Sequence, residues 1–196
     1  DKSFLEFESN QNYKHYNIDI TDYQKVNMII KKYSFDIIFH FAAESHVDNS
    51  INNPAIFIET NIIGTFNLLS IAFNNWMTGP NSVKENHTKS RFHHVSTDEV
   101  YGSLGDTGLF SEKTPYAPNS PYSASKASSD MLVRSFVETY GMNCTISNCS
   151  NNYGPFQHVE KLIPTIINSA INGKTIPIYG DGMNVRDWLY AVSYTH

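Results

Sequence analysis

Apolar and polar residues follow one another along the chain in blocks that predict alternating strands and helices. Short runs at residues 16–20, 92–96 and 143–149 are expected to be strands. Residues 36–43 form a continuous apolar run, as expected of a central strand in a parallel sheet. A longer stretch beginning at Pro54 predicts a long, heavily buried helix. Its apolar positions recur at helical spacing and are Ile58, Ile62, Phe66, Leu69 and Phe73.

Capping residues set the expected limits of two helices. Residues 21–24 (Thr-Asp-Tyr-Gln) match a capping box that would begin a helix running to about Tyr33. Ser120 as N-cap, Pro121 in the first turn and Gly141 as terminator frame a second helix. Both limits are local signals, because a cap and its partner lie within a few residues of each other.

The remaining segments are expected to be connections and short elements. Residues 79–90 are polar and predict an exposed loop, and residues 97–119 predict a long irregular connection. After residue 149 the sequence predicts a loop, a helix at 160–171, a short strand at 176–179 and a Gly-Asp-Gly turn.

This alternation indicates an α/β protein with a doubly wound parallel sheet and right-handed crossovers. In such sheets ligands bind at the carboxyl ends of the strands. The chemistry is therefore expected at Asp19 and at residues 42–45, 96–99 and 151–153.

Charge and length narrow the functional classes. The formal net charge is −5 and no basic run occurs, so binding to nucleic acid or to an anionic membrane has no electrostatic support. The apolar stretches are shorter than the roughly 20 residues that a membrane span needs. With 196 residues, the chain can form one domain, or one domain and part of another. Its opening residues, Asp-Lys-Ser-Phe, are neither a start methionine nor a secretory signal.

Cysteines and histidines give no sign of a disulfide or a metal site. Cys144 and Cys149 are five apart in one expected strand, so they would face opposite sides, and a reduced cytosolic setting is the default. The chain has eight histidines, but His93 and His94 are adjacent on a strand and point apart. No His-x-x-x-His pair occurs on an expected helix, so no metal is expected.

The strongest chemical signal is a tyrosine and a lysine on one helix face. Tyr122 and Lys126 are four residues apart, so their side chains are neighbours. Lys126 falls on the apolar stripe of the helix, with Val133 and Phe136, where an ammonium is costly unless it is needed. At roughly 5 Å it would stabilise the phenolate by about 3 kcal/mol and lower the pKa of Tyr122 below its usual value near 10. The alternative is that Lys126 extends to solvent.

Residues 96–99 (Ser-Thr-Asp-Glu) place two carboxyl groups directly after a strand. One interpretation is a capping box, but the following residues contain two glycines and no helical period. The other is a paired acid and base, in which Asp98 and Glu99 share one cleft and differ in pKa. On the motif alone both interpretations remain open.

Together these motifs closely resemble those of the extended short-chain dehydrogenase/reductases, and within them the nucleotide-sugar 4,6-dehydratases of the NAD-dependent epimerase/dehydratase family. The resemblance runs from about Tyr16 to Tyr190, with the motifs in the same order and spacing. The matching segments are residues 42–48, 96–102, 122–126, 150–155, 160–164 and 186–190.

The resemblance implies catalytic roles for five residues. Tyr122 would take a proton from the sugar 4-hydroxyl while hydride passes from C4 to NAD, and Lys126 would lower the pKa of Tyr122 and hold the nicotinamide ribose. Thr97 would hydrogen-bond near the 4-hydroxyl. Glu99 would remove the C5 proton, which the new C4 carbonyl acidifies, and Asp98 would protonate the departing 6-hydroxyl. Hydride would then return to C6.

The resemblance also implies the binding residues. Besides Tyr122 and Lys126, the positions that match NAD contacts are Asp19, Ile20, Phe41, Ala42, Ala43, Glu44, Ser45, Thr60 and Asn152. The alternative for Asp19 is a helix-entry residue beside Thr21. The expected substrate is dTDP-glucose. Positions that match its contacts are Ser45, Thr97, Asn151, Lys161, Leu162, Pro177, Ile178, Tyr179 and Arg186, and Arg186 suits a pyrophosphate because of its bidentate fork. A solvated surface arginine is the alternative.

The match is incomplete at both ends. The family's glycine-rich phosphate loop, its first strands and most of its sugar-nucleotide domain have no counterpart, and residues 191–196 depart from the pattern. We therefore expect a partial Rossmann-like NAD-binding domain at residues 1–150 and the start of a substrate-binding region at 151–196. The face of the second helix that carries Ala124, Ala127 and Met131, with the apolar helix at 58–73, predicts a helix-packed homodimer as relatives form.

Two other functions remain open. One is a UDP-glucose 4,6-dehydratase or a nucleotide-sugar 4-epimerase of the same superfamily; the adjacent Asp98 and Glu99 argue against the epimerase. The other is a relative, or an inactive fragment, that keeps the fold for binding without catalysis.

Overall fold

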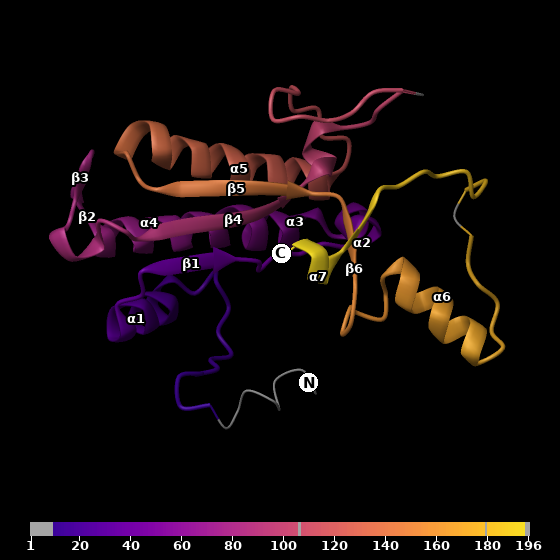
Figure 1. The fold of residues 1–196 in the computed structure, drawn as a ribbon, viewed down its shortest axis with the longest axis horizontal. Coiled ribbons are helices and arrows are strands. Elements are labelled where there is room, and N and C mark those ends of the chain that lie inside the picture. The colour runs from indigo at the N-terminus through magenta and orange to yellow at the C-terminus, as the bar shows by residue number, and fades with distance from the viewer. Residues whose placement is uncertain (1–9, 106, 179, 195–196) are drawn as a thin grey trace. The chain divides into compact units, whose positions relative to one another are not determined.

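The computed structural model describes residues 10–105, 107–178 and 180–194, and Figure 1 shows its elements. The described residues divide into two compact units. One is Asn17–Asn148, and the residues from Cys149 onwards belong to the other. This division lies beside the expected domain boundary at residue 150. The assignment of NAD to the first domain and of the substrate to the second stays a prediction.

A three-stranded sheet organises the first unit, and its strand order is β1-β4-β5. The strands are β1 (Ile37–His40), β4 (Arg91–Thr97) and β5 (Cys144–Cys149). β1 and β4 are parallel, with His40 beside His94 at the end of the ladder, and Figure 1 shows β5 running in the same direction. The α/β class, the parallel sheet and the strands at 92–96 and 143–149 are confirmed.

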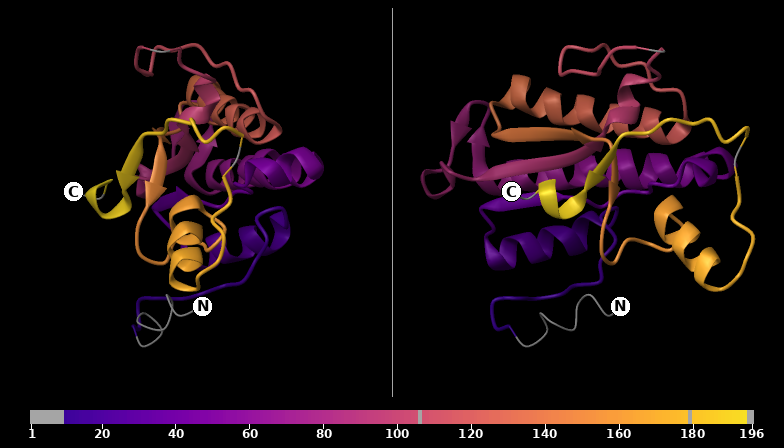
Figure 2. Two further views of the ribbon diagram at one scale, coloured as in Figure 1. Left: turned by 90° about the vertical axis from the view of Figure 1, so that its right-hand side faces the viewer. Right: turned by 45° about the vertical axis from the view of Figure 1, so that its right-hand side comes forward.

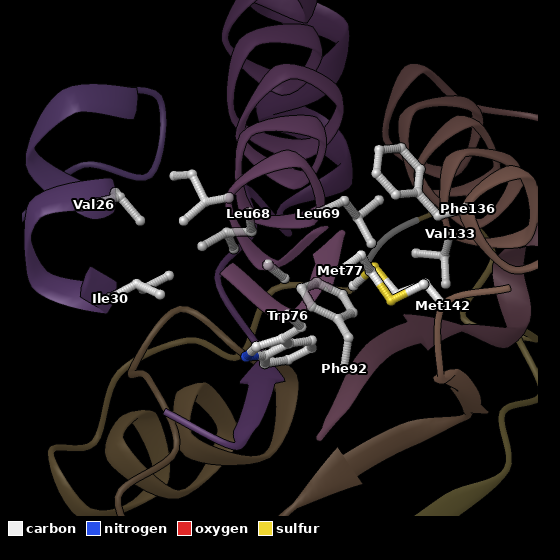
Figure 3. Packing of buried hydrophobic residues seen from close by; sticks show 12 residues of the cluster. Val26, Ile30, Leu68, Leu69, Trp76, Met77, Phe92, Val133, Phe136 and Met142 are labelled. Atoms are coloured by element: carbon white, nitrogen blue, oxygen red, sulfur yellow. The ribbon is translucent and has the colours of Figure 1, made fainter. Parts of the chain in front are cut away.

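Three helices cover one face of this sheet and form the core with it. They are α1 (Tyr23–Tyr33), α4 (Thr65–Trp76) and α5 (Pro121–Tyr140), and Figure 2 shows them on the same side of the strands. In Figure 3, Leu68 and Leu69 of α4 lie between Val26 of α1 and Phe136 of α5, above Phe92 of β4. This core holds the carboxyl ends of β1 and β4 beside the first turns of α5.

The expectation that residues 36–43 form a central strand is wrong for the described chain. β1 is shorter than that run and has β4 as its one neighbour in the sheet. Ile38 packs against the core, whereas Ile37 and Phe39 are exposed and Phe41 is 70% exposed. The reason is that the described helices cover one sheet face, so alternate residues of β1 lack a covering layer.

The long apolar helix is continuous, but its buried face differs from the expected stripe. It begins with α3 (Pro54–Phe57), passes through a π-helical segment (η2, Ile58–Gly64) and continues as α4. Ile58 is 52% exposed and Phe66 is also exposed, whereas Phe57, Asn61 and Thr65 are buried. A π turn holds more residues than an α turn, so it rotates the side chains that follow it out of the 3.6-residue period.

By length and composition alone, the helical run Pro54–Trp76, 23 residues long, could cross a membrane. The expectation that apolar stretches fall short of that length is therefore wrong. Half of the run's most apolar part is buried inside the chain, where it packs against α1 and α5. A core helix passes the same test of length and composition.

Caps at the helix ends were predicted with mixed success. Around α5 all three expectations are confirmed: Ser120 forms a capping box with Ser123, Pro121 begins the helix, and Gly141 ends it in the left-handed region at φ 68°. α1 begins later than expected, because Asp22 rather than Thr21 caps it by accepting a hydrogen bond from the Lys25 N–H at 3.1 Å. Thr21 instead donates to the Asp19 carboxylate.

Three local expectations in the first unit are corrected. Residues 16–20 are not a strand, because they have no ladder partner in the described chain, although Ile18 and Ile20 still pack on the core. The loop at 79–90 contains a small hairpin, β2 (Met77–Gly79) with β3 (Ser82–Val83), and a 3-10 turn (η3, Glu85–His87). The connection after β4 opens with another 3-10 turn (η4, Asp98–Tyr101). A short helix, α2 (Val47–Asn52), follows β1.

The second unit is built around a parallel strand pair. β6 (Asn151–Tyr153) pairs with β7 (Trp188–Tyr190). The sequence predicted a loop in place of β6. α6 (Leu162–Ile171) confirms the expected helix, starting two residues later, and α7 (Ala191–Tyr194) was not predicted. The expected strand at 176–179 is absent over residues 176–178, and Tyr179 lies outside the described residues. Tyr153, Ile163, Ile167 and Tyr190 line a cavity of about 490 Å³.

Candidate functional site

The first turns of α5 place Tyr122 and Lys126 in the interior. Tyr122 is 9% exposed and its ring meets Phe57 edge to face at 6.3 Å. Lys126 is 4% exposed, and its Nζ donates to the Val95 carbonyl of β4 at 2.8 Å. The helical spacing therefore predicted the orientation of Lys126 correctly, and the alternative of a solvent-directed lysine is wrong. A buried ammonium held at the end of a central strand is an arrangement that a structural role alone does not require.

The end of β4 carries Thr97, Asp98 and Glu99. Thr97 is buried, Asp98 is half-buried and Glu99 is exposed. The Thr97 hydroxyl accepts a hydrogen bond from the Glu99 N–H at 3.3 Å and donates to the Asp98 carboxylate at 3.3 Å. Thr97 thus caps the 3-10 turn η4. The sequence argument that no helix follows this motif was wrong, since a one-turn helix needs no apolar period.

Packing brings the acidic motif and the Tyr122 helix together. Ala127 of α5 packs against Val100 and Tyr101 of η4, so the turn that carries Asp98 and Glu99 rests on the helix that carries Tyr122 and Lys126. Gly102 ends η4 at φ 87°, where a side chain would collide with the Ala117 carbonyl. The five expected catalytic residues therefore lie on α5, on η4 and at the end of β4, and α5 contacts both of the other two elements.

Asn61 joins three of the expected cofactor segments and was missed by the sequence analysis. Its side chain lies in the π-helical segment, accepts from the Glu44 N–H at 2.9 Å and donates to the Glu44 carbonyl at 3.0 Å. It also donates to the Ser125 hydroxyl at 2.8 Å. Asn61 therefore clamps the loop at 41–45 to the face of α5 between Tyr122 and Lys126. Little in the sequence pointed to Asn61, because the same helical run carries other polar residues such as Glu59 and Asn67.

The other expected cofactor residues of this unit line the same edge. Phe41, Ala42 and Ser45 are exposed beyond β1, and Ala43, Glu44 and Thr60 are half-buried. Ile20 packs on Gly64, which has no side chain to obstruct it. Asn67 of α4 holds this turn by donating to the Ile20 and Thr21 carbonyls at 3.1 and 2.9 Å.

Asp19 makes the hydrogen bonds of a helix-entry residue. Its carboxylate accepts from the Thr21 N–H and hydroxyl, both at 2.8 Å, and these bonds hold the pKa of Asp19 below its usual value. The carboxylate is exposed and ionised at neutral pH. Asp19 thus acts as a helix-entry residue beside Thr21, which was the alternative interpretation. A contact between the same carboxylate and the adenosine of NAD stays a prediction.

Two buried histidines lie behind Lys126. His40 and His94 have ring centroids 5.0 Å apart, and His40 Nε2 is 2.8 Å from the Thr65 hydroxyl. Burial, with the nearby His94 and Lys126 charges, lowers the pKa of His40 to about 3. Burial also lowers the pKa of His94. Both rings are therefore neutral at pH 7 and add no positive charge beside Lys126.

The expected cofactor residue Asn152 and the described substrate residues after Cys149 lie in the second unit. Asn152 donates to the Cys149 sulfur and to the Ser150 carbonyl, both at 3.1 Å. Asn151 is half-buried in β6. Lys161 is the N-cap residue of α6 and Leu162 its first residue. Pro177, Ile178 and Arg186 are exposed, and Arg186 donates to the Val185 carbonyl. Of the expected substrate residues, Ser45 and Thr97 thus belong to the first unit, and the described ones after Cys149 belong to the second.

Among the described residues, no group of three histidine, cysteine or acidic side chains could hold a metal ion. Cys144 and Cys149 form no disulfide. Burial raises the pKa of Cys144 to about 12, so its thiol is protonated.

Sequence comparison accounts for this combination of residues. The family described as GDP-mannose 4,6 dehydratase matches residues 3–196. The chain belongs to this family. Among curated relatives of the family, the dTDP-glucose 4,6-dehydratase of Neisseria meningitidis serogroup B is 53% identical over 191 residues, covering 97% of this chain and 53% of the relative. That of Haemophilus influenzae is 51% identical over 187 residues, covering 95% and 54%. The chain thus spans about half the length of the curated relatives it matches.

Solved structures from the family and its superfamily share the fold. The dTDP-glucose 4,6-dehydratase DesIV of Streptomyces venezuelae, solved with NAD bound, is 42% identical, has a TM-score of 0.88 and covers 99% of this chain and 56% of its own. The UDP-glucose 4-epimerase of Thermotoga maritima, solved with UDP-glucose, is 28% identical, has a TM-score of 0.82 and covers 94% and 57%. The Rossmann-like fold expected from the motifs is confirmed.

Proposed function

We propose that this chain carries the catalytic residues of an NAD-dependent dTDP-glucose 4,6-dehydratase. The observation that carries the proposal is the buried Lys126 ammonium, one helical turn from Tyr122, on a helix that packs against the turn bearing Asp98 and Glu99. The relatives of about half identity are dTDP-glucose 4,6-dehydratases, which favours dTDP-glucose over the other nucleotide sugars.

In the first step Tyr122 accepts the proton of the sugar 4-hydroxyl. Lys126 stabilises the phenolate, because its ammonium is removed from water and the histidines behind it are neutral. Thr97, at the end of β4, donates a hydrogen bond near the same hydroxyl. NAD, when bound, supplies the oxidant that takes hydride from C4 and returns it to C6.

The second step removes water across C5 and C6. With a carbonyl at C4, the C5 proton is acidic, and Glu99 removes it as general base. Asp98 gives its proton to the departing 6-hydroxyl, which leaves as water. Glu99 is exposed and Asp98 is half-buried and bonded to Thr97, so the two adjacent carboxyls have different surroundings, as an acid and a base require. After reduction at C6, Glu99 returns the proton to C5, giving a 4-keto-6-deoxy sugar.

The residues present fit the cofactor at two places. Lys126 and the Tyr122 hydroxyl are donors suited to the hydroxyls of the nicotinamide ribose, and the exposed carboxylate of Asp19 suits the donors of the adenosine. Phe41 to Ser45, fixed by Asn61, form the edge between them. We assign Ile20, Thr60 and Asn152 to the same cofactor, and Asn151, Lys161, Leu162, Pro177, Ile178, Tyr179 and Arg186 to the nucleotide sugar.

The test uses an extended form, in which the segments of the Neisseria meningitidis relative that this chain does not cover are added from that relative. Incubated with dTDP-glucose and NAD, it should give the 4-keto-6-deoxy product. Turnover of UDP-glucose but not of dTDP-glucose would favour the UDP-glucose 4,6-dehydratase. Inversion at C4 without loss of water would favour the epimerase. NAD binding without turnover of either sugar would indicate a non-catalytic relative and reject the proposal.

Glu99→Gln tests the division of labour between the carboxyls. The variant should still form reduced cofactor from dTDP-glucose, because Tyr122 and Lys126 are intact, but product formation should fall by about 100-fold or more as general-base catalysis is lost. Reduced-cofactor absorbance and product are measured together. Glu112→Gln is the matched control, since Glu112 is an exposed acid on the connection after η4. Normal product formation by Glu99→Gln would show that another group is the base.

We also propose a cytoplasmic homodimer. Ala124 and Met131 of α5 are exposed, as are Ile58 and Phe66 of the long helix, and together they offer apolar surface to a second copy. Ala127 is excluded from this surface because it is buried against η4. The unpaired cysteine thiol of Cys144, protonated and half-buried, agrees with a reducing compartment.

A further inference from the structure

Asp130 is a fully buried carboxylate that none of the steps above uses. It lies on α5, one turn beyond Lys126, and is 0% exposed. Its Oδ2 accepts hydrogen bonds from the Ser96 hydroxyl at 2.8 Å, the Tyr116 hydroxyl at 2.9 Å and the Asn148 side-chain amide at 3.4 Å. Its Oδ1 lies 3.2 Å from His94 Nε2. A carboxylate without solvent is costly, and one with three donors converging on a single oxygen serves to hold those donors in place.

The three donors come from the three segments that surround the acidic motif. Ser96 precedes Thr97 at the end of β4, and Asn148 lies at the end of β5. The Asn148 amide also donates to the Thr97 carbonyl at 3.2 Å, so it links that carbonyl to Asp130. Tyr116 belongs to the connection after η4, and its ring meets Tyr101 of η4 edge to face at 5.3 Å.

The bonds to Asp130 persist near neutral pH because its partners keep their protons. Burial, and then the Asp130 carboxylate, raise the pKa of Tyr116 above its usual value, so the phenol remains a donor. Ser96 and Asn148 do not titrate. The titratable groups that interact with this carboxylate include His94, Tyr101 and Tyr116, and Lys126 lies one turn away on α5.

We propose that Asp130 is a positioning residue that fixes the Thr97–Glu99 segment against the face of α5 carrying Tyr122 and Lys126. Asp130 is linked to the motif in three ways. Ser96 precedes Thr97 in the chain, the Asn148 amide binds the Thr97 carbonyl, and Tyr116 packs against Tyr101 of η4. This inference rests on the proposed function, because the distance it controls matters for catalysis only if Asp98 and Glu99 act on a sugar whose C4 is oxidised at Tyr122.

Asp130→Asn in the extended form tests this role. The amide is isosteric, but its uncharged oxygen is a weaker acceptor than the carboxylate oxygen, so the hydrogen bonds from Ser96, Tyr116 and Asn148 weaken together. Because the acid and base are displaced while Tyr122 and Lys126 keep their helix, product formation should fall about 100-fold, with KM for dTDP-glucose nearly unchanged. Reduced cofactor should accumulate during turnover, as for Glu99→Gln. Tyr116→Phe, which removes one donor and leaves the carboxylate, should show the same signature with a loss of about tenfold.

Controls separate positioning from a general loss of structure. Glu138→Gln makes the same charge change at an exposed position of α5 and should leave all readouts unaltered. Two outcomes for Asp130→Asn would overturn the inference and leave the proposed function intact. One is activity equal to that of the parent, and the other is loss of activity without accumulation of reduced cofactor.

Hydrogen exchange on the present chain provides a test that needs no activity. In Asp130→Asn, and in Ser96→Ala should the first variant fail to fold, amides of residues 97–102 should exchange faster while those of residues 131–140 keep their protection. Equal loss of protection in both segments would show a purely structural role and overturn the inference. If the parent extended form turns over no nucleotide sugar, the proposed function fails and this exchange result alone judges whether Asp130 holds the segment.

Discussion

At the scale of the residue, Lys126 combines deep burial with a charge, and its Nζ donates to the Val95 carbonyl. Lys126→Met keeps most of the apolar stem and removes the ammonium. We expect the turnover of the extended form to fall by about 100-fold or more at neutral pH, because the phenolate of Tyr122 loses its stabilising charge. The activity that remains should continue to rise up to a higher pH than in the parent, because the pKa of Tyr122 is higher without the ammonium. A pH–rate profile measures this shift.

The control for this prediction lies on the same helix. Arg134 is an exposed cation two turns beyond Lys126, so Arg134→Met alters charge and length similarly without touching the site. Its turnover and pH profile should match those of the parent. A Lys126→Met profile whose rising limb is not shifted to higher pH would contradict the assignment of Tyr122 as the base.

His40 makes the stability of the chain depend on pH. Its pKa is about 3 when folded and 6.5 otherwise, so the unfolded chain binds the extra proton between these values. Above pH 6.5 this residue has no effect, and as the pH falls towards 3 the free energy of unfolding should drop by about 1.4 kcal/mol per pH unit. Urea unfolding at pH 6.5 and pH 5 should differ by about 2 kcal/mol from His40 alone.

Replacing the imidazole isolates this contribution. His40→Gln can keep the bond to Thr65 and does not titrate, so its stability should vary less with pH than that of the parent. His158→Gln, at an exposed histidine, should retain the parent's slope. His94 acts in the same direction, since burial lowers its pKa too, so some slope should remain in His40→Gln. An identical slope in all three proteins would refute this account.

At the scale of the element, the N-terminus of α5 supports the site directly, because Tyr122 and Lys126 lie in its first two turns. Ser120→Ala removes the side-chain acceptor for the Ser123 N–H at 3.0 Å. We expect a loss of about 1 kcal/mol in the free energy of unfolding and faster hydrogen exchange over the first turn. Ser128→Ala, on the exposed face of the same helix, should be close to neutral in both measurements. Equal effects in the two variants would argue against the cap.

At the scale of the whole molecule, the exposed apolar residues of the two long helices predict the oligomeric state. Phe66→Lys combined with Met131→Lys places two charges on the surface proposed for a second copy. The extended form should sediment as a dimer and this variant as a monomer, since burying unpaired charges opposes association. Leu109→Lys changes a residue that is 91% exposed elsewhere on the unit, and should leave the dimer intact. A parent that sediments as a monomer would remove the proposal.

Much of the fold and of the candidate site could be predicted from local sequence. Ser120, Pro121 and Gly141 defined α5 because a cap, a first-turn proline and a left-handed terminator act through atoms a few residues away. The same helix geometry gave the inward orientation of Lys126, since residues four apart share a face. Strands β4 and β5 were recognised from short stretches whose apolar residues include Phe92, Val95 and Ile146.

Tertiary structure decided the rest, because burial and ladder pairing depend on partners far along the chain. Residues 16–20 have strand-like sequence but no neighbouring strand in the described chain, and Phe66 faces solvent because the π-helical segment before it shifts the helix phase. The clamp of Asn61 on Glu44 and Ser125 joins positions 17 and 64 residues apart. Asp130 collects donors 34, 14 and 18 residues away. The sequence by itself thus determined which chemical groups the helix and strand ends present, and only the packed fold decided which of them meet.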